Sequence, residues 1–395
     1  MTTIAEVEAL AGQNLFDYQV EALLEAAALP GTAQRTCLYY KTGAGKSITA
    51  LGSMLMWGHS EVLVIAPPAT HHQWEQLAER LSMNIDVISH ARFRMPGYKL
   101  SRTMPVIADE MHLFGGHDGK GWRKLDQLAM HLKAPMVLAS ATPNYNDADR
   151  VYCIEHILAP QRVKGGFLQF IYQHCETEQN PFGQMPKVLG FLHHPDAASY
   201  LAAMPGVSYL PDDLVYTITD IPIPKWDDVD LEDYGYDSKN HRVMASQIEE
   251  RHTRVFRALV NDQNLVQDHV YRELETLLAR ATTPVLVFSA HSTVANALNV
   301  TLGLRGVQSD VVVGDLTPKQ KRLRIEKFLS GDTDVLVGTA TLATGTDGMD
   351  KVCDWLIILD DTDDDALRRQ LVGRIMPRGL DTDVAKKQVY RLVQQ

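Results

Sequence analysis

Short, continuous apolar runs alternate along the chain with stretches of helical periodicity. The runs Glu61–Ala66, Pro105–Ala108 and Pro135–Ala139 show no polar alternation, as expected of parallel strands buried on both faces. Between the strands, apolar residues such as Trp122 and Leu125 recur at the spacing of one helix face. Strands that alternate with helices predict a parallel sheet with helices on both of its faces.

The same alternation returns in the last third of the chain. Strand-like runs are found there at Pro284–Phe288, Asp310–Val313, Asp334–Val337, Trp355–Leu359 and Gln388–Leu392. Thr317, Pro318 and Gln320 predict a helix start, because Thr can cap it, Pro suits its first turn and Gln can reach back to the cap. We therefore expect an α/β protein with two domains in tandem.

Between the two sets the regularity breaks down. Proline and glycine punctuate the segment from Val151 to Lys225, and Asp227–Asp237 is acidic and typical of a solvated loop. We expect a first domain over residues 1–160, a connector over 161–225 and a second domain over 226–395.

Composition narrows the class of protein. The 395 residues suffice for two to three domains at about 150 residues each. A formal net charge of −11 argues against a protein that coats nucleic acid through a global positive field, although a local basic groove remains compatible with it. The four cysteines form no CxxC pair, which argues against a disulfide framework and a zinc site. The sequence shows no signal peptide and no membrane span, so we expect a cytoplasmic protein of a bacterium or virus, with the nucleus as the alternative.

The segment Lys41–Ser47 (KTGAGKS), which we call the phosphate loop, lies between an apolar run and a helix-like run. Its two close glycines let backbone N–H groups turn inward around a phosphate, Lys46 can reach the β/γ oxygens, and the Ser47 hydroxyl can ligate Mg²⁺. A helix behind the loop would also favour an anion at its N-terminus. The alternative is a glycine turn followed by an exposed lysine, since Tyr40 stands where the full pattern has its first glycine.

Other polar residues follow strand-like runs. Asp109 and Glu110 come directly after Pro105–Ala108. A strand-end Asp can hold Mg²⁺ through water, and the adjacent Glu can orient and deprotonate an attacking water. Two solvated carboxylates in a loop are the alternative. Ser140 ends another strand and would by itself be a turn or helix cap.

Taken together, these segments resemble the superfamily-two helicases and translocases, over nearly the whole chain and in the same order. KTGAGKS is similar to motif I, DEMH to a DExH motif II, SAT to motif III, VLVFSAHS to motif IV, TLATGTDGMD to motif V and QLVGRIMPRG to motif VI. FDYQ is similar to the adenine-recognising Q motif. VLVIAPPATHHQWEQ and GDLTPKQKRLRIEKF are nearest in text to the Swi/Snf-type duplex translocases.

The resemblance implies two RecA-like domains with an ATP cleft between them. The nucleotide would lie on Thr42, Gly43, Ala44, Gly45, Lys46 and Ser47. Gln19 would contact the adenine, unless it is a buried helix-start glutamine. Ser47 and Asp109 would hold Mg²⁺, and Glu110 would be the base. His112, Ser140 and Thr142 would couple hydrolysis to domain closure.

The resemblance also assigns residues of the second domain to the nucleotide. Gly345, Asp347 and Gln370 would face it, together with Arg374. The second arginine of motif VI falls where this chain has Pro377, and Arg378 stands one place later. The arginine that neutralises charge on the γ-phosphate is therefore either Arg374 or Arg378.

The implied function is that of a nucleic-acid-dependent ATPase motor using ATP and Mg²⁺, a DNA helicase or a duplex DNA translocase. The track would lie across both domains, touched by segments after Pro67, around Ser89-His90 and around Ser289–His291. A small basic cluster could meet phosphates or be a solvated loop; it comprises Arg92, Arg94, Lys99 and Arg102. With no reader module present, binding should be backbone-directed, to DNA rather than RNA.

Other functions stay open at this stage. One is an RNA helicase; another is an ATP-switched clamp or loading subunit recruited by a protein partner, which the acidic net charge would suit. Glu110 and Arg374 argue against a pure switch, because a switch has little use for a hydrolytic base. A metabolic kinase does not explain the second α/β domain. A two-domain motor without appendages suggests a compact genome, such as that of a phage.

Overall fold

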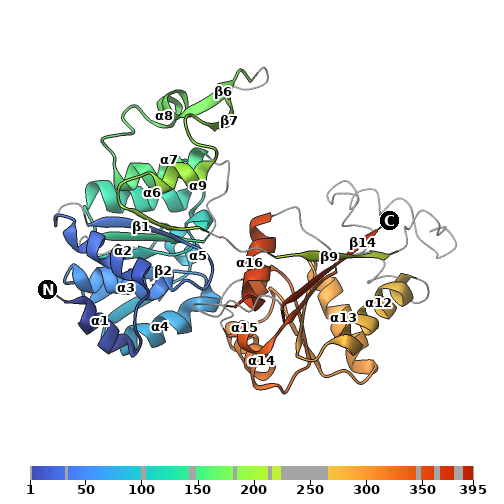
Figure 1. The fold of residues 1–395 in the computed structure, drawn as a ribbon. Helices are drawn as coiled ribbons and strands as arrows, with labels where there is room; N and C mark the ends of the chain where they lie inside the picture. Colours follow the sequence, from blue (N-terminus) through green and yellow to red (C-terminus); the bar gives the residue numbers. More distant parts are fainter. Residues whose placement is uncertain are drawn as a thin grey trace. The chain divides into compact units, whose positions relative to one another are not determined.

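The structure is a computed structural model that describes residues 2–31, 34–98, 104–141, 148–180, 185–211, 216–223, 266–343, 348–359, 365–377 and 386–394 (Figure 1). Contacts within the chain divide it into two compact units, Met1–Asp213 and Leu214–Gln395, which we call unit 1 and unit 2.

Unit 1 is built on a six-stranded sheet of order β3-β2-β4-β5-β1-β8, in which every neighbouring pair is parallel. The strands are β1 (Arg35–Tyr40), β2 (Glu61–Ile65), β3 (Asn84–Ile88), β4 (Val106–Ala108), β5 (Met136–Ser140) and β8 (Val207–Leu210). The strands predicted from the three apolar runs are confirmed as β2, β4 and β5. The edge strands β3 and β8 carry no such run, because one of their faces is partly exposed and polar.

Helices cover both faces of this sheet, and successive strand residues serve opposite faces. Leu38 and Tyr40 of β1 pack in one core cluster, and Cys37 and Tyr39 pack in the other. The first cluster takes residues from α1 (Ile4–Ala11), α2 (Asp17–Ala28), α3 (Lys46–Met56) and α4 (His71–Arg80). The second takes residues from α5 (His90–Arg94), α6 (Lys120–Asp126), α7 (Ala148–Leu158), α8 (Phe167–His174) and α9 (Ala197–Ala202). A 3-10 turn, η1 (Pro68–Thr70), precedes α4; another, η2 (Met111–Phe114), follows β4; and a π-helical turn (Gln127–His131) extends α6.

The segment expected as a connector, residues 161–225, contributes regular elements to both units. Up to β8 it lies in unit 1, where α8 and an antiparallel hairpin of β6 (Cys175–Glu178) and β7 (Lys187–Phe191) stand off from the sheet beyond α7 and α9 (Figure 1). A buried carboxylate, that of Glu155, links α7 to α9 in this part of unit 1. Glu155 of α7 accepts a hydrogen bond from the Tyr200 hydroxyl of α9 (2.7 Å) and pairs with Arg162 (2.8 Å).

Unit 2 contains a second six-stranded parallel sheet, of order β11-β12-β10-β13-β14-β9. Its strands are β9 (Ile218–Ile223), β10 (Val285–Phe288), β11 (Ser309–Val312), β12 (Val335–Gly338), β13 (Trp355–Ile358) and β14 (Gln388–Gln394). One face packs against α12 (Val266–Arg280) and α13 (Ser292–Leu304), and the other against α14 (Pro318–Ser330), α15 (Met349–Val352) and α16 (Asp365–Ile375). A 3-10 turn, η6 (Ala340–Ala343), follows β12.

The five strands predicted in this region are confirmed, and β9 joins them from the segment before residue 224. The predicted start of α14 is also confirmed: the Gln320 N–H donates to Thr317 Oγ1 (3.3 Å), and the Thr317 N–H donates to Gln320 Oε1 (3.0 Å). The acidic segment Asp227–Asp237 lies outside the described residues. Two mostly parallel sheets, each flanked by helices, confirm the predicted tandem α/β fold. Within the described part of the chain, no helix combines the length and apolar character needed to span a membrane.

Candidate nucleotide site

The phosphate loop joins the end of β1 to the start of α3. Gly43 and Gly45 both have positive φ angles, 79° and 75°, which only glycine adopts at little cost. Gly45 caps α3, and Lys46 is the first residue of that helix. The loop therefore ends at a helix N-terminus, where backbone N–H groups lack partners within the helix and favour an anion.

Helix α2 holds the loop from behind. The Ala44 carbonyl accepts hydrogen bonds from the Tyr18 hydroxyl (3.0 Å) and the Gln19 side-chain amide (3.3 Å). Since C=O and N–H point in opposite directions across a trans peptide, the Gly45 N–H is turned away from α2. Gln19 is 2% exposed, and its Oε1 also accepts the Phe16 N–H (2.9 Å). Gln19 thus acts as a helix-start glutamine that also orients the loop; its contact with adenine stays a prediction.

Tyr40 occupies the place of the missing first glycine for a packing reason. It is the last residue of β1 and fully buried, and its hydroxyl lies 2.9 Å from Ser208 Oγ on the neighbouring strand β8. Its ring meets Tyr18 edge-on, with centroids 5.5 Å apart. The backbone here is an ordinary strand, so the turn begins one residue later and needs no glycine at this position.

Asp109 and Glu110 follow β4, as predicted. Asp109 is 7% exposed; its carboxylate accepts the Glu110 N–H (3.0 Å) and a hydrogen bond from the Trp74 side chain. Burial, and then the charge of Glu110, hold the pKa of Asp109 above its usual range, and the positive charge of Lys46 opposes this rise. The interaction with Lys46 means that the phosphate loop and Asp109 share one electrostatic environment.

Sheet order explains this proximity. The strands β4, β5 and β1 are neighbours, and the carboxyl ends of parallel strands meet at one edge of the sheet. Asp109 follows β4, Ser140 is the last residue of β5, and the phosphate loop follows β1. The Lys46 ammonium donates to the carbonyl oxygens of Tyr40 (3.2 Å) and Lys41 (3.4 Å), which keeps it over the end of β1.

Glu110 has an unusual backbone conformation. Its φ and ψ of 50° and 62° are left-handed, which costs a non-glycine residue about 1–2 kcal/mol. The turn places Glu110 Oε2 3.3 Å from His112 Nδ1. Strain of this kind persists only where surrounding contacts enforce it, and it concentrates at functional sites.

Ser140 and His112 lie behind this edge of the sheet. Ser140 is 4% exposed, and both residues line a cavity of about 20 Å³ together with Trp122 and Arg150. A volume of this size holds roughly one water molecule. The cavity lies between the segment after β4 and α7, in the region where the resemblance implies coupling residues.

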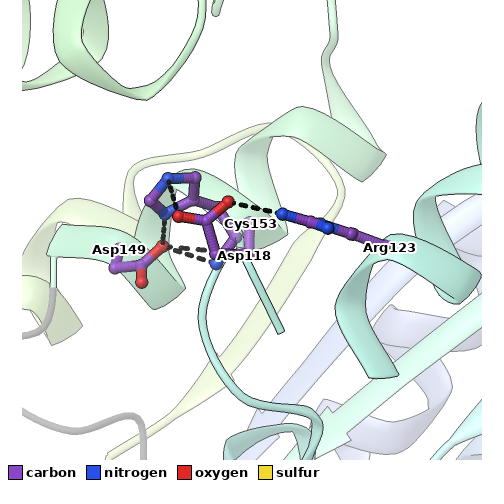
Figure 2. A network of polar contacts seen from close by, with 5 residues as sticks. Asp118, Arg123, Asp149 and Cys153 are labelled. Carbon is purple, nitrogen blue, oxygen red and sulfur yellow. Dashed lines mark hydrogen bonds and ion pairs between the residues drawn. The ribbon is translucent and has the colours of Figure 1, made fainter. Parts of the chain in front are cut away.

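A polar network ties the loop after η2 to α7 (Figure 2). Asp149 Oδ1 accepts the His117 main-chain N–H (2.7 Å) and lies 2.7 Å from His117 Nδ1, while Asp118 pairs with Arg123 (2.8 Å). A Cβ at Gly116 would lie 1.8 Å from Asp149 Oδ2, so any larger residue there would displace the Asp149 side chain from its place in the network. The segment that follows Glu110 is therefore fastened to the helix that follows Ser140.

In unit 2, Gln370 and Arg374 stand one turn apart on α16, and each is 8% exposed. Their shared face is fixed by the packing of Leu371 and Ile375 in the core. Thr142, Gly345, Asp347 and Arg378 lie outside the described residues, as do Lys99 and Arg102 of the basic cluster. Arg92 and Arg94 are exposed on α5.

The donor set suits Mg²⁺ better than a transition metal. The side chains of Asp109 and Ser47 offer hard oxygen donors, the kind that Mg²⁺ prefers in company with water and substrate phosphates. The described residues contain no group of three or more His, Cys, Asp or Glu side chains able to hold a metal ion by themselves. Two adjacent carboxylates beside a phosphate loop are compatible with a cation that binds together with a nucleotide.

Two further residues belong to this site: Trp74, to which the sequence assigned no role, and His90, which was expected only in a segment that meets the track. Both are buried, at 1% and 6% exposure, and both hydrogen-bond to Asp109. In the sequence Trp74 is an apolar position of a helix and His90 is one histidine among fifteen. The only available signal is that each can donate a hydrogen bond from an otherwise apolar environment.

Comparisons with known proteins bear on the class of this fold. Residues 268–379 match the family described as the helicase conserved C-terminal domain. The structure of S. cerevisiae Dbp5 bound to RNA and ADP BeF3 is similar over 99% of this chain and 86% of that one, with 15% identity and a TM-score of 0.55. Mycobacterium smegmatis helicase Lhr bound to ssDNA and AMP-PNP is similar over 96% of this chain, with 14% identity and a TM-score of 0.53; this chain spans 47% of the Lhr chain.

The Sulfolobus solfataricus SWI2/SNF2 ATPase core in complex with dsDNA is similar over 96% of this chain and 88% of that one, with 14% identity and a TM-score of 0.42, too low to favour the Swi/Snf type. No curated protein matches the chain significantly. The predicted resemblance to the superfamily-two helicases is confirmed at the level of the fold, and residues 268–379 of unit 2 match the helicase conserved C-terminal domain.

The contact between Gly45 and Gln19 gives a test of the loop. A Cβ at Gly45 would lie 2.3 Å from Gln19 Nε2, a buried amide that cannot move without losing its hydrogen bonds. Gly45→Ala should lower the free energy of unfolding by more than the ~1–2 kcal/mol expected for a left-handed alanine, and should weaken nucleotide binding. Urea unfolding and binding of a fluorescent ATP analogue measure the two effects.

Gly58→Ala is the matched control. Gly58 has a similar φ of 83°, and a Cβ added there would meet nothing within 4 Å, so only the backbone cost applies. Adding Gln19→Ala to Gly45→Ala should recover part of the lost stability. Equal destabilisation by the two glycine substitutions would show that Gln19 does not constrain the loop.

Proposed function

We propose that this protein is an ATP-dependent nucleic-acid motor, a DNA helicase or duplex DNA translocase. The observation that carries the proposal is the placement of the phosphate loop and Asp109 at one edge of the same sheet, after β1 and β4, where Lys46 interacts electrostatically with Asp109 beside Glu110. A helicase C-terminal domain in unit 2 supports it, since an isolated phosphate loop would also suit a kinase or a switch.

In this proposal the phosphate loop binds the β- and γ-phosphates of ATP, with Lys46 as their cation and Gln19 at the adenine. Ser47 and Asp109 would hold Mg²⁺, which would supply positive charge to neutralise the phosphates. Glu110 orients the attacking water and accepts its proton. From unit 2, Gly345, Asp347 and Gln370 contact the nucleotide, and Arg374 or Arg378 supplies the arginine finger.

The two units would bind the nucleic acid alternately, so that ATP turnover is converted into movement along it. His112, Ser140 and Thr142 would couple hydrolysis to domain closure. We propose RecA-like cores over residues 1–160 and 226–395, to which β8 and β9 of the segment between them each add one edge strand. We also propose DNA as the track, a DExH-type motif II and a cytoplasmic, phage-encoded setting. An RNA helicase and an ATP-switched clamp or loading subunit recruited by a protein partner are the competing proposals. Glu110 favours the motor over the switch, because its strained backbone aims a carboxylate that a switch would not need.

Substitution of Lys46 and substitution of Glu110 should both abolish ATP turnover, but only the first should also abolish ATP binding. Lys46→Ala should lose both ATP binding and turnover, whereas Glu110→Gln should keep binding and lose about 10²–10⁴-fold in kcat, the usual contribution of a general base. Steady-state ATPase assays and nucleotide-binding titrations separate the two. Lys120→Ala and Glu79→Gln change exposed residues of unit 1 and serve as controls. Near-normal turnover in either site variant contradicts the assignment.

The nature of the track is tested by stimulation of the ATPase. Duplex DNA should raise the rate more than single-stranded DNA or RNA of equal length, and the stimulation should fall with salt, because backbone contacts release counterions. A strand-displacement assay run in parallel distinguishes a helicase from a translocase. Greater stimulation by RNA would favour the RNA helicase, and no stimulation by any of the three would favour the ATP switch.

Arginine substitutions in unit 2 identify the finger. Arg374→Ala should lower kcat about 10³-fold, because the arginine stabilises charge that develops on the γ-phosphate. Arg374→Lys should recover little, since lysine cannot present two parallel donors. Thermal unfolding controls for folding, because Arg374 is buried, and Arg322→Ala, on the exposed face of α14, is the matched control. A larger loss from Arg378→Ala would assign the finger to that residue.

A further inference from the structure

Two buried side chains from separate helices contact Asp109, one at its carboxylate and the other at its main-chain carbonyl. Trp74, on α4, donates a hydrogen bond to the carboxylate, and His90, on α5, binds the main-chain carbonyl through Nε2 (2.9 Å). Neither side chain belongs to the phosphate loop or to the Asp109-Glu110 pair. Together they fix both the side chain and the backbone of Asp109.

The geometry of His90 defines its chemical state. A carbonyl oxygen only accepts hydrogen bonds, so Nε2 must carry the proton. Burial lowers the pKa of His90 to about 4, which keeps the imidazole neutral near pH 7. The ring also meets Phe114 edge-on, with centroids 4.8 Å apart and an interplanar angle of 70°. His90 therefore touches the chain on both sides of Glu110, at Asp109 before it and at Phe114 after it.

These contacts of His90 lie on both sides of Glu110 in the chain and hold its strained backbone. Glu110 keeps its left-handed backbone, with φ of 50°, between an Asp109 carbonyl held by His90 and a 3-10 turn packed on the same ring. Glu110 also donates its own N–H to the Asp109 carboxylate (3.0 Å), whose place Trp74 helps to fix. The direction of the Glu110 carboxylate thus depends on two residues outside the Asp109-Glu110 pair.

Helix α5 is itself firmly placed. Ser89 caps it by accepting the Arg92 N–H (3.1 Å). Lys124 of α6 donates to the carbonyl oxygens of Phe93 (2.8 Å), Met95 (3.2 Å) and Tyr98 (2.8 Å) at its other end. Its outer face carries the exposed arginines Arg92 and Arg94. A displacement of α5 by a ligand on that face would be passed to the Asp109 carbonyl through a single buried hydrogen bond.

We propose that His90 is a positioning residue that links the outer face of α5 to the carboxylate pair Asp109-Glu110, and that Trp74 does the same for α4. The link rests on the proposed function, in which α4 and α5 lie in the segments that meet the track. Binding of nucleic acid to α5 then sets the orientation of Glu110 and so the rate of hydrolysis, without any contact between the track and the nucleotide.

Two substitutions at His90 separate the hydrogen bond from packing. His90→Phe keeps a ring against Phe114 but removes the donor; His90→Gln keeps an amide donor at similar reach. His90→Phe should lower the nucleic-acid-stimulated kcat by about 10-fold or more, as for other small misplacements of reacting groups, with the KM for ATP changed less than about twofold. His90→Gln should restore most of the rate. Trp74→Phe, which loses the donor to the carboxylate, should behave like His90→Phe.

Phe93→Leu is the matched packing control, because Phe93 meets the same Phe114 ring (5.9 Å) from the same helix and its side chain has no hydrogen-bond donor to offer Asp109. Arg92→Ala should raise the nucleic-acid concentration needed for half-maximal stimulation. If His90→Phe and Phe93→Leu lower kcat equally, or if His90→Gln rescues nothing, the positioning role is wrong.

Hydrogen exchange, which does not depend on catalysis, tests the positioning role of His90 separately from the proposed function. Hydrogen exchange of peptides that span residues 106–116 should speed up in His90→Phe and return to the original rate in His90→Gln, with Phe93→Leu little changed. Should the protein show this pattern but no nucleic-acid-stimulated ATPase, the positioning role stands and the motor is wrong. Stimulated ATPase with unchanged exchange and kcat in His90→Phe would instead support the motor and overturn the positioning role.

Discussion

The burial of the Asp109 carboxylate is the constraint on which the site in unit 1 depends. Removing a carboxylate from water is unfavourable unless hydrogen bonds and opposite charges compensate. Here the Glu110 N–H, the Trp74 side chain and the charge of Lys46 do so, and each comes from a different element. Satisfying one buried group therefore fixes the relation of α4, the phosphate loop and the segment after β4.

The backbone of the phosphate loop is likewise fixed by hydrogen bonds from another element. Tyr18 and Gln19 hold the Ala44 carbonyl, so the conformation of the loop is built into α2 before any ligand binds. Preorganised N–H groups need little rearrangement on meeting a phosphate, which favours both binding and turnover. Tyr40 is still part of strand β1, so the turn that follows needs no glycine at this position.

In unit 2, core packing of helix α16 fixes the positions of the candidate site residues. Gln370 and Arg374 lie on one face of α16, and Leu371 and Ile375 anchor that helix in the core of the second sheet. An arginine side chain held by a packed helix loses less freedom on reaching a phosphate than one on a loop. The match to the helicase conserved C-terminal domain covers this helix.

The sequence by itself determined the two parallel sheets, the phosphate loop, the strand-end position of Asp109-Glu110 and the cap of α14, because apolar runs, glycine pairs and capping residues act locally. It did not determine the edge strands β3, β8 and β9, whose faces are half-polar. Only the tertiary structure decided that Tyr40 belongs to the core, that Gln19 orients Ala44, and that Trp74 and His90 meet at Asp109. These contacts join residues about 20 or more positions apart, and neither periodicity nor motif spacing encodes which buried donor will face which acceptor.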